Sequence, residues 1–116
     1  MMEKEQQLLD NITEYLDSAK EAKSKGRINS TLTLLFKAVF IIIDLYILKQ
    51  EGFIPSNHSE RFRILDQKYH ELYKILDKNF PVYQNSYRIK LTKEHLEVLE
   101  DDIRKISEFT KIKINY

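Results

Sequence analysis

The sequence predicts an all-α protein, folded as an up-down bundle of four to five helices in a single domain over residues 1–116. The 116 residues include only two glycines and two prolines, too few helix breakers for the many turns of a β-rich fold. Apolar residues recur every three to four positions over most of the chain, which is the spacing of one helix face. One central segment is apolar at nearly every position. A chain of this length can bury a core without disulfides, and it has no cysteine.

The first helix is predicted over Met2–Lys25, where one apolar stripe has the spacing of an amphipathic helix. Gly26 follows a lysine-rich last turn and is the expected stop. The second helix is predicted over Ile28–Gln50, with Ser30 or a neighbour as its cap, and it ends before Gly52. Short connections on both sides of this helix predict that the first three helices are antiparallel neighbours.

The third helix follows a turn predicted at Gly52–Asn57. Asn57 is a candidate cap, with Glu60 three residues later as in a capping box. The helix then carries a narrow apolar stripe, with alternating spacings of three and four residues. The residues of this stripe are Phe62, Leu65, Tyr69, Leu72 and Leu76.

The last helix is separated from the third by a predicted break over Asn79–Ser86, where Pro81 disfavours a continuous helix. Thr92 is a plausible cap for the final helix. The tail, residues 111–116, is predicted to be frayed helix or an extended segment.

The second helix is apolar on nearly every face, so it must be covered on all sides. Three neighbouring helices of a small monomer rarely cover a helix completely, and we therefore expect a second copy to complete the cover in a homodimer. Lys37 and Asp44, seven residues apart, share a face where this helix is expected to meet water or the edge of the interface.

A cytoplasmic location without membrane insertion is expected. The apolar stretch Leu34–Leu48 has 15 residues and two charges, whereas a spanning helix needs about 20 largely uncharged residues. The N-terminus is charged where an export signal needs an apolar stretch. The 19 basic and 18 acidic residues nearly cancel, so any attraction to nucleic acid must be local.

Most catalytic and cofactor motifs are missing from the sequence. It has no glycine-rich phosphate loop, no His-Glu-x-x-His and no nucleophile elbow. The three histidines, His58, His70 and His95, are not spaced to converge on zinc, which needs about four ligands. We therefore expect no metal and no cofactor, and we expect His70 at the surface.

One segment late in the chain, YQNSYRIKLTKEH, holds the candidate site. Arg88 and His95 are separated by six residues, with Tyr87, Lys90 and Lys93 around them. An arginine holds a phosphate through a planar fork of donors, and a histidine can take or give a proton. Together they could cleave RNA without a metal, the arginine steadying the phosphorane while the histidine assists the 2′-hydroxyl. On composition alone the simpler interpretation is an ion-paired arginine and a histidine in the first turn of a helix, because such a pair arises easily by chance.

The run GRINSTLTLLFKAVFIIIDLYILKQEGFIPSNHSERFRIL resembles the middle of HEPN domains. These domains have a long apolar helix, a Lys/Gly turn, a proline and a His-Ser start to the next helix, which here are matched by Pro55, His58 and Ser59. The later YRIKLTKEH resembles the Arg-x(4–6)-His signature of the family and places it on Arg88 and His95.

The resemblance covers residues 2–109 in helix order and implies a dimerising bundle of four or five helices. It also implies frequent pairing with a minimal nucleotidyltransferase in toxin–antitoxin modules. In active members, the Arg-His pairs of two protomers face each other and form a metal-independent endoribonuclease site. Here Ile89 follows Arg88 where active members have a polar residue, and no tyrosine lies just beyond His95 as in members switched off by nucleotide transfer.

We therefore expect a non-catalytic HEPN-like module that is the partner of a nucleotidyltransferase and binds a nucleotide, RNA or protein. The alternative is an endoribonuclease that uses Arg88 and His95 across a homodimer, and a third reading is a plain helical bundle without HEPN kinship. The expected binding residues are Tyr87, Lys90, Lys93 and His58. In a binding module, the basic groups in Lys20–Arg27 and Arg61–Arg63 would serve docking.

Overall fold

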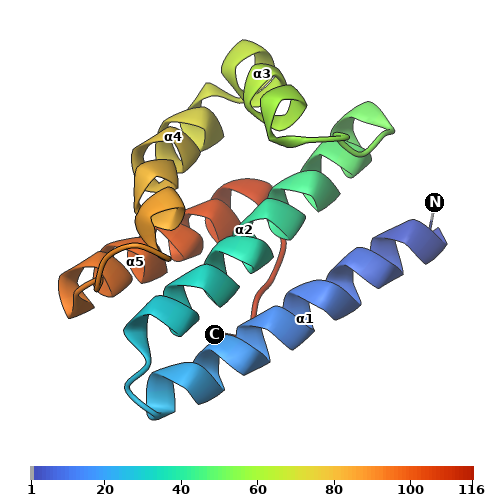
Figure 1. Ribbon diagram of the computed structural model, residues 1–116. Helices are drawn as coiled ribbons and strands as arrows, with labels where there is room; N and C mark the ends of the chain where they lie inside the picture. The colour runs from blue at the N-terminus through green and yellow to red at the C-terminus, as the bar shows by residue number, and fades with distance from the viewer. Residues whose placement is uncertain (1) are drawn as a thin grey trace.

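The computed structural model describes residues 2–116, and this part of the chain is helical without any β-strand (Figure 1). Its helices are α1 (Met2–Ser24), α2 (Ile28–Glu51), α3 (His58–Lys68), α4 (His70–Asn85) and α5 (Lys93–Thr110). The predicted all-α bundle is therefore confirmed. α1 and α2 form a long antiparallel hairpin, α5 packs on another side of α2, and α3 and α4 form a bent pair (Figure 1).

The turn between α1 and α2 ends the first helix at the predicted place. Gly26 has a φ of +72°, a left-handed conformation that favours glycine. The N–H of Arg27 donates to the carbonyl of Ala22 at 3.0 Å, and the N–H of Gly26 donates to the carbonyl of Lys23 at 3.0 Å. This pair of bonds is the Schellman motif, which satisfies the last carbonyls of α1.

The core is built around α2 and takes buried side chains from all five helices. α1 contributes a stripe that includes Ile12 and Leu16, and α5 contributes one that includes Leu99 and Ile103. The fully enclosed side chains of α2 include Leu32, Leu35, Phe36, Ile42, Ile43, Leu45 and Ile47. By length and composition α2 could cross a membrane, but 72% of its apolar stretch is buried against the rest of the chain.

Helices of the same chain bury most of α2 and leave Leu34, Ile41 and Tyr46 half-buried, so a second copy is not needed to cover most of this helix. Lys37 is exposed as expected, but Asp44 on the same face is buried and only 9% exposed. A homodimer stays a prediction.

The predicted third helix is divided in two at Tyr69, whose φ of −134° and ψ of 64° are not helical. The Tyr69 hydroxyl donates to the Glu51 carboxylate, its ring packs on Tyr46 with 5.1 Å between centroids, and Lys68 pairs with Glu51 at 2.7 Å. These contacts tie the corner to the end of α2. α3 therefore packs on α4 near the end of α2, on the side away from α1, instead of running along α2 as a third antiparallel neighbour (Figure 1).

The predicted break at Pro81 is also wrong, since α4 continues through it to Asn85. The loop begins after α4, and Thr92 then caps α5 as predicted. Residues 112–116 are extended and return toward α1, with Ile112 only 5% exposed (Figure 1). The extended alternative for the tail is confirmed, but the segment is packed on the core.

Candidate functional site

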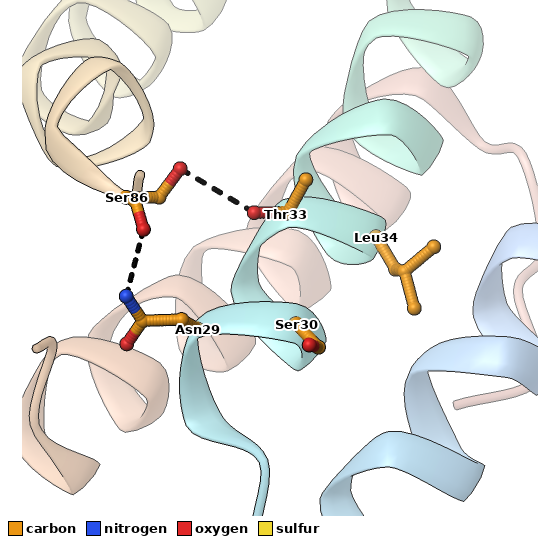
Figure 2. A pocket seen from close by; sticks show the side chains of 5 residues that line it. All are labelled: Asn29, Ser30, Thr33, Leu34 and Ser86. Atoms are coloured by element: carbon orange, nitrogen blue, oxygen red, sulfur yellow. Dashed lines mark hydrogen bonds between the residues drawn. The ribbon is translucent and has the colours of Figure 1, made fainter. Parts of the chain in front are cut away.

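The candidate site lies at the end of the bundle where α2 begins and the loop from α4 to α5 passes over it. The side chain of Asn29, in the first turn of α2, holds this loop. Its amide nitrogen donates to the carbonyls of Ser86 and Ile89, both at 2.7 Å, and its oxygen accepts from the N–H of Leu91 at 2.9 Å. Figure 2 shows Asn29 and Thr33 pointing from α2 toward Ser86, whose hydroxyl lies 3.4 Å from that of Thr33.

Two cavities adjoin at this end of the molecule and share Asn29 and Ser30. The first has a volume of about 330 Å³ and no acidic side chain in its lining. Its lining includes Arg27, Ile28, Asn29, Ser30, Lys90 and Leu91. The second has a volume of about 400 Å³ and a lining rich in hydroxyl and amide groups. Its lining consists of Asn29, Ser30, Thr33, Leu34 and Ser86 (Figure 2).

The charge around the first cavity is positive. Arg27 at the start of α2, Arg88 and Lys90 in the loop, and Lys93 at the start of α5 form what we call the basic end. All four residues are exposed, and none forms an ion pair within residues 2–116. The neighbouring Glu94 has a lowered pKa, chiefly because a backbone N–H at the start of its own helix binds the carboxylate.

Tyr87 extends the basic end with an aromatic surface that is 79% exposed. The Nε of Arg88 donates to the Tyr87 hydroxyl at 3.1 Å, and the guanidinium carbon lies 5.4 Å from the ring centroid. Ile89 beside them is 52% exposed. Because burial does not account for this ring, it is available to stack on a planar ligand.

The side chain of His95 forms hydrogen bonds with the N-terminus of its own helix, α5. Its Nδ1 accepts from the backbone N–H of Thr92 at 3.0 Å, and its own N–H donates to the Thr92 hydroxyl at 3.3 Å. This is a capping box in which histidine replaces the usual glutamate or glutamine. With Nδ1 as acceptor, the neutral ring carries its proton on Nε2, so the lone pair of Nδ1 is engaged in this cap and Nε2 is a donor. No hydrogen bond or ion pair joins His95 to Arg88 in the described chain.

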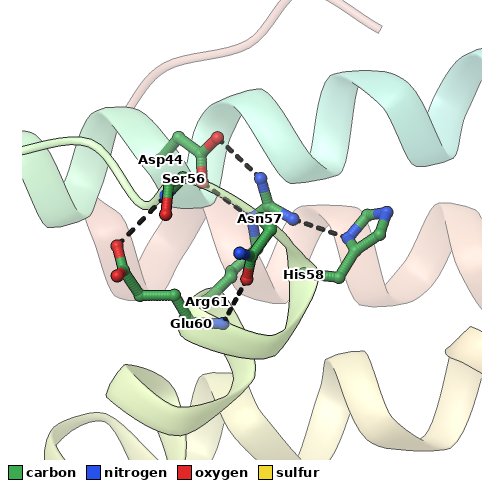
Figure 3. Close-up of polar contacts among 6 residues, drawn as sticks. All are labelled: Asp44, Ser56, Asn57, His58, Glu60 and Arg61. Atoms are coloured by element: carbon green, nitrogen blue, oxygen red, sulfur yellow. Dashed lines mark hydrogen bonds and ion pairs between the residues drawn. The ribbon is translucent and has the colours of Figure 1, made fainter.

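His58 lies in a separate cluster, away from the predicted binding residues of the loop. Its Nδ1 faces the Nη1 of Arg61 at 2.6 Å (Figure 3). Its ring also packs against Phe40 and Phe80. Burial, and then the positive charge of Arg61, lower the pKa of His58, while Asp44 opposes this shift. The structure therefore brings Tyr87, Arg88 and Lys90 together in one loop and leaves His58 out.

Arg61 is not available for docking, contrary to the prediction for residues 61–63. It is 7% exposed, and its Nε and Nη2 donate to the two carboxylate oxygens of Asp44 at 2.7 and 2.8 Å (Figure 3). In the other predicted basic group, Lys23 is paired with Glu100 at 2.7 Å. Another cavity, of about 560 Å³, includes Lys23 in its lining, but Glu100 lies in it and reduces its positive charge. Among these groups, Arg27 is the cation that joins Lys90 in one cavity.

Asn29 is the residue of this site that the sequence did not single out, whereas Arg27 belonged to the predicted basic group Lys20–Arg27. Arg27 lies in the connection before α2, and Asn29 lies in the first turn of α2. The apolar pattern of this helix explains why it folds and gives no sign of a polar site at its start. Asn29 bonds to residues 57 to 62 positions later in the chain. A pairing across that separation leaves no local pattern in the sequence. The predicted cap at Ser30 is wrong, because Arg27 is the N-cap residue of α2 and no side chain in residues 2–116 caps this helix.

Comparison with protein-family models, curated proteins and solved structures finds no match to this chain. In residues 2–116, no three His, Cys, Asp or Glu side chains are grouped so as to hold a metal ion. The chemistry of the site must therefore be argued from its own geometry.

Proposed function

We propose that this protein is a non-catalytic HEPN-like module that binds the phosphate backbone of single-stranded RNA at its basic end. Arg27 and Lys90 would hold one phosphate between them, and Tyr87 would stack on a neighbouring base. The expected nucleotidyltransferase partner belongs to the same proposal and rests on the resemblance to HEPN domains alone.

The observation that carries the proposal is that Arg27 and Lys90, from two distant segments, line one cavity free of acidic side chains. Unpaired cations beside such a cavity favour an anion, and a guanidinium provides the planar donors that suit a phosphate. Further cations at Arg88 and Lys93 would follow a chain of phosphates. Exposed Tyr87 adds one stacking surface beside these cations, and surfaces that bind single strands combine the two kinds of group.

The geometry of His95 supports binding over cleavage. A general base must have a nitrogen free to take a proton, and the capping box occupies Nδ1 while Nε2 carries the proton. An endoribonuclease would require His95 to release Thr92 and a second copy to complete the site.

The first experiment measures the binding of a fluorescein-labelled ten-nucleotide oligouridylate by anisotropy over a range of salt concentrations. Arg27→Ala and Lys90→Ala are each expected to weaken binding about three- to tenfold at moderate salt, since each removes one phosphate contact. The slope of log affinity against log salt should fall by about 0.7 for each contact removed. Uridine monophosphate as competitor distinguishes a strand from a single nucleotide.

Lys49→Ala is the matched control, because Lys49 is an exposed lysine near the far end of the same helix. It should bind as the wild type does. Equal losses for Lys49→Ala and Lys90→Ala would mean general attraction to positive charge and would contradict the proposed site. Absence of binding by the wild type at low salt would exclude the function.

The endoribonuclease alternative is tested on the same RNA in the presence of EDTA. Our proposal expects intact RNA after prolonged incubation. EDTA-resistant cleavage that leaves cyclic phosphate ends and is lost in Arg88→Ala would instead establish the nuclease.

A further inference from the structure

We infer that Asn29 is a positioning residue that holds Lys90 in place for the ligand, an inference that rests on the proposed function. Asn29 does not itself carry charge. Its side chain binds the backbone on both sides of Lys90, namely the carbonyl of Ile89 at 2.7 Å and the N–H of Leu91 at 2.9 Å.

The rest of the loop offers little to fix this lysine. Bonds within the loop lie before it: the N–H groups of Arg88 and Ile89 both donate to the carbonyl of Asn85, at 3.0 and 3.1 Å. The next side chain along the loop that is buried in the core is that of Leu91, which is 6% exposed. Lys90 itself is exposed. Asn29 is thus the link that joins its two peptide neighbours to α2.

The position of Asn29 explains why this link matters for the cavity. Asn29 is two residues after Arg27, and both residues line the same cavity as Lys90. One amide therefore ties the backbone on both sides of Lys90 to the helix turn that follows Arg27. Ordering a flexible loop when a ligand binds costs conformational entropy. A loop that is already fixed avoids this cost, and the affinity of the site is higher for that reason.

Asn29→Ala removes all three hydrogen bonds while keeping the charge of the basic end. We expect it to weaken oligouridylate binding about tenfold, as expected when a loop must be ordered on binding. The slope of affinity against salt should remain that of the wild type, because the number of cations is unchanged. Hydrogen exchange should accelerate at the amides of residues 87–91. Asn11→Ala, at an exposed asparagine in α1, is the matched control.

The deciding measurement is a double-mutant cycle between Asn29→Ala and Lys90→Ala on the same RNA. If Asn29 acts through Lys90, its substitution should cost less than about twofold once Lys90 is absent. A full tenfold loss in the Lys90→Ala background would overturn the inference, as would unchanged exchange in the loop of Asn29→Ala. Failure of the wild type to bind would overturn the proposed function instead, and the positioning role with it.

Discussion

At the scale of single residues, the fold buries one ion pair, between Asp44 and Arg61, at a high cost in desolvation. Both side chains are nearly buried, at 12% and 9% exposure, and they meet through two parallel hydrogen bonds. Taking two charges out of water is costly, and the paired geometry offsets that cost only while both partners are present. The sequence suggested a water-facing Asp44, because a helical pattern shows which residues share a face but not which distant side chain meets them.

Substitution of one member of this ion pair should therefore lower the free energy of unfolding more than substitution of both. Arg61→Ala is expected to lower the free energy of unfolding by about 3 kcal/mol, because it leaves the Asp44 carboxylate buried without its cation. Arg61→Met combined with Asp44→Leu should recover most of that loss. Urea denaturation followed by circular dichroism measures both, and a single variant no less stable than the double one would contradict this account.

His58 makes the stability of the protein sensitive to mild acid. Its pKa is lowered in the folded state, chiefly by burial and then by Arg61, so folding favours the neutral ring. The groups facing it are Arg61 from its own helix, Asp44 and Phe40 from α2, and Phe80 from α4. The stability that depends on neutral His58 is therefore present above about pH 6.5 and is lost as the pH falls through the lower folded pKa.

The change His58→Gln should flatten the decline in melting temperature between about pH 7 and pH 5. His70→Gln is the control, because His70 is an exposed histidine on the neighbouring helix α4. Melting curves for both variants and the wild type, recorded across that range, provide the comparison. An unchanged decline in His58→Gln would assign the acid sensitivity to other groups.

At the scale of elements, the helix ends were predictable where they depend on local chemistry. Gly26, Asn57 and Thr92 each end or begin a helix as expected, because a left-handed glycine or a capping oxygen acts within a few residues. The corner at Tyr69 was not predictable, since it depends on Glu51, 18 positions earlier in the chain. The helix continues through Pro81, where the sequence predicted a break. Residues on both sides of Pro81 pack on α2: Phe80 against Phe40, and Tyr83 against Phe36 and Phe40.

The start of α5 allows the structural role of His95 to be separated from a catalytic one. Glutamine is a usual residue at this position of a capping box, so His95→Gln should preserve the cap and change stability by less than about 0.5 kcal/mol. His95→Ala should cost about 1 kcal/mol. Thermal denaturation gives both values, and RNA binding by His95→Gln should match the wild type. A stable His95→Gln variant that had lost all activity on RNA would show that the ring itself takes part.

At the scale of the whole molecule, α2 is enclosed by its own chain, and the loop carrying Arg88 and Lys90 is held against its first turn. The sequence predicted the fold class, because hydrophobic periodicity and composition determine it, but it placed the break before the last helix too early in the chain. It could not predict the cavity, which exists only because residues 27–30 and 86–91 meet. We therefore propose that RNA binds where these two segments come together.

A titration of ¹⁵N-labelled protein with oligouridylate tests this claim most directly, because it reports every backbone amide at once. We predict chemical-shift changes concentrated in residues 27–30 and 86–93, with little change in the turn at 52–57 at the other end of α2. Changes concentrated around Lys20, Lys23 and Arg104, or spread evenly over exposed lysines, would contradict the account.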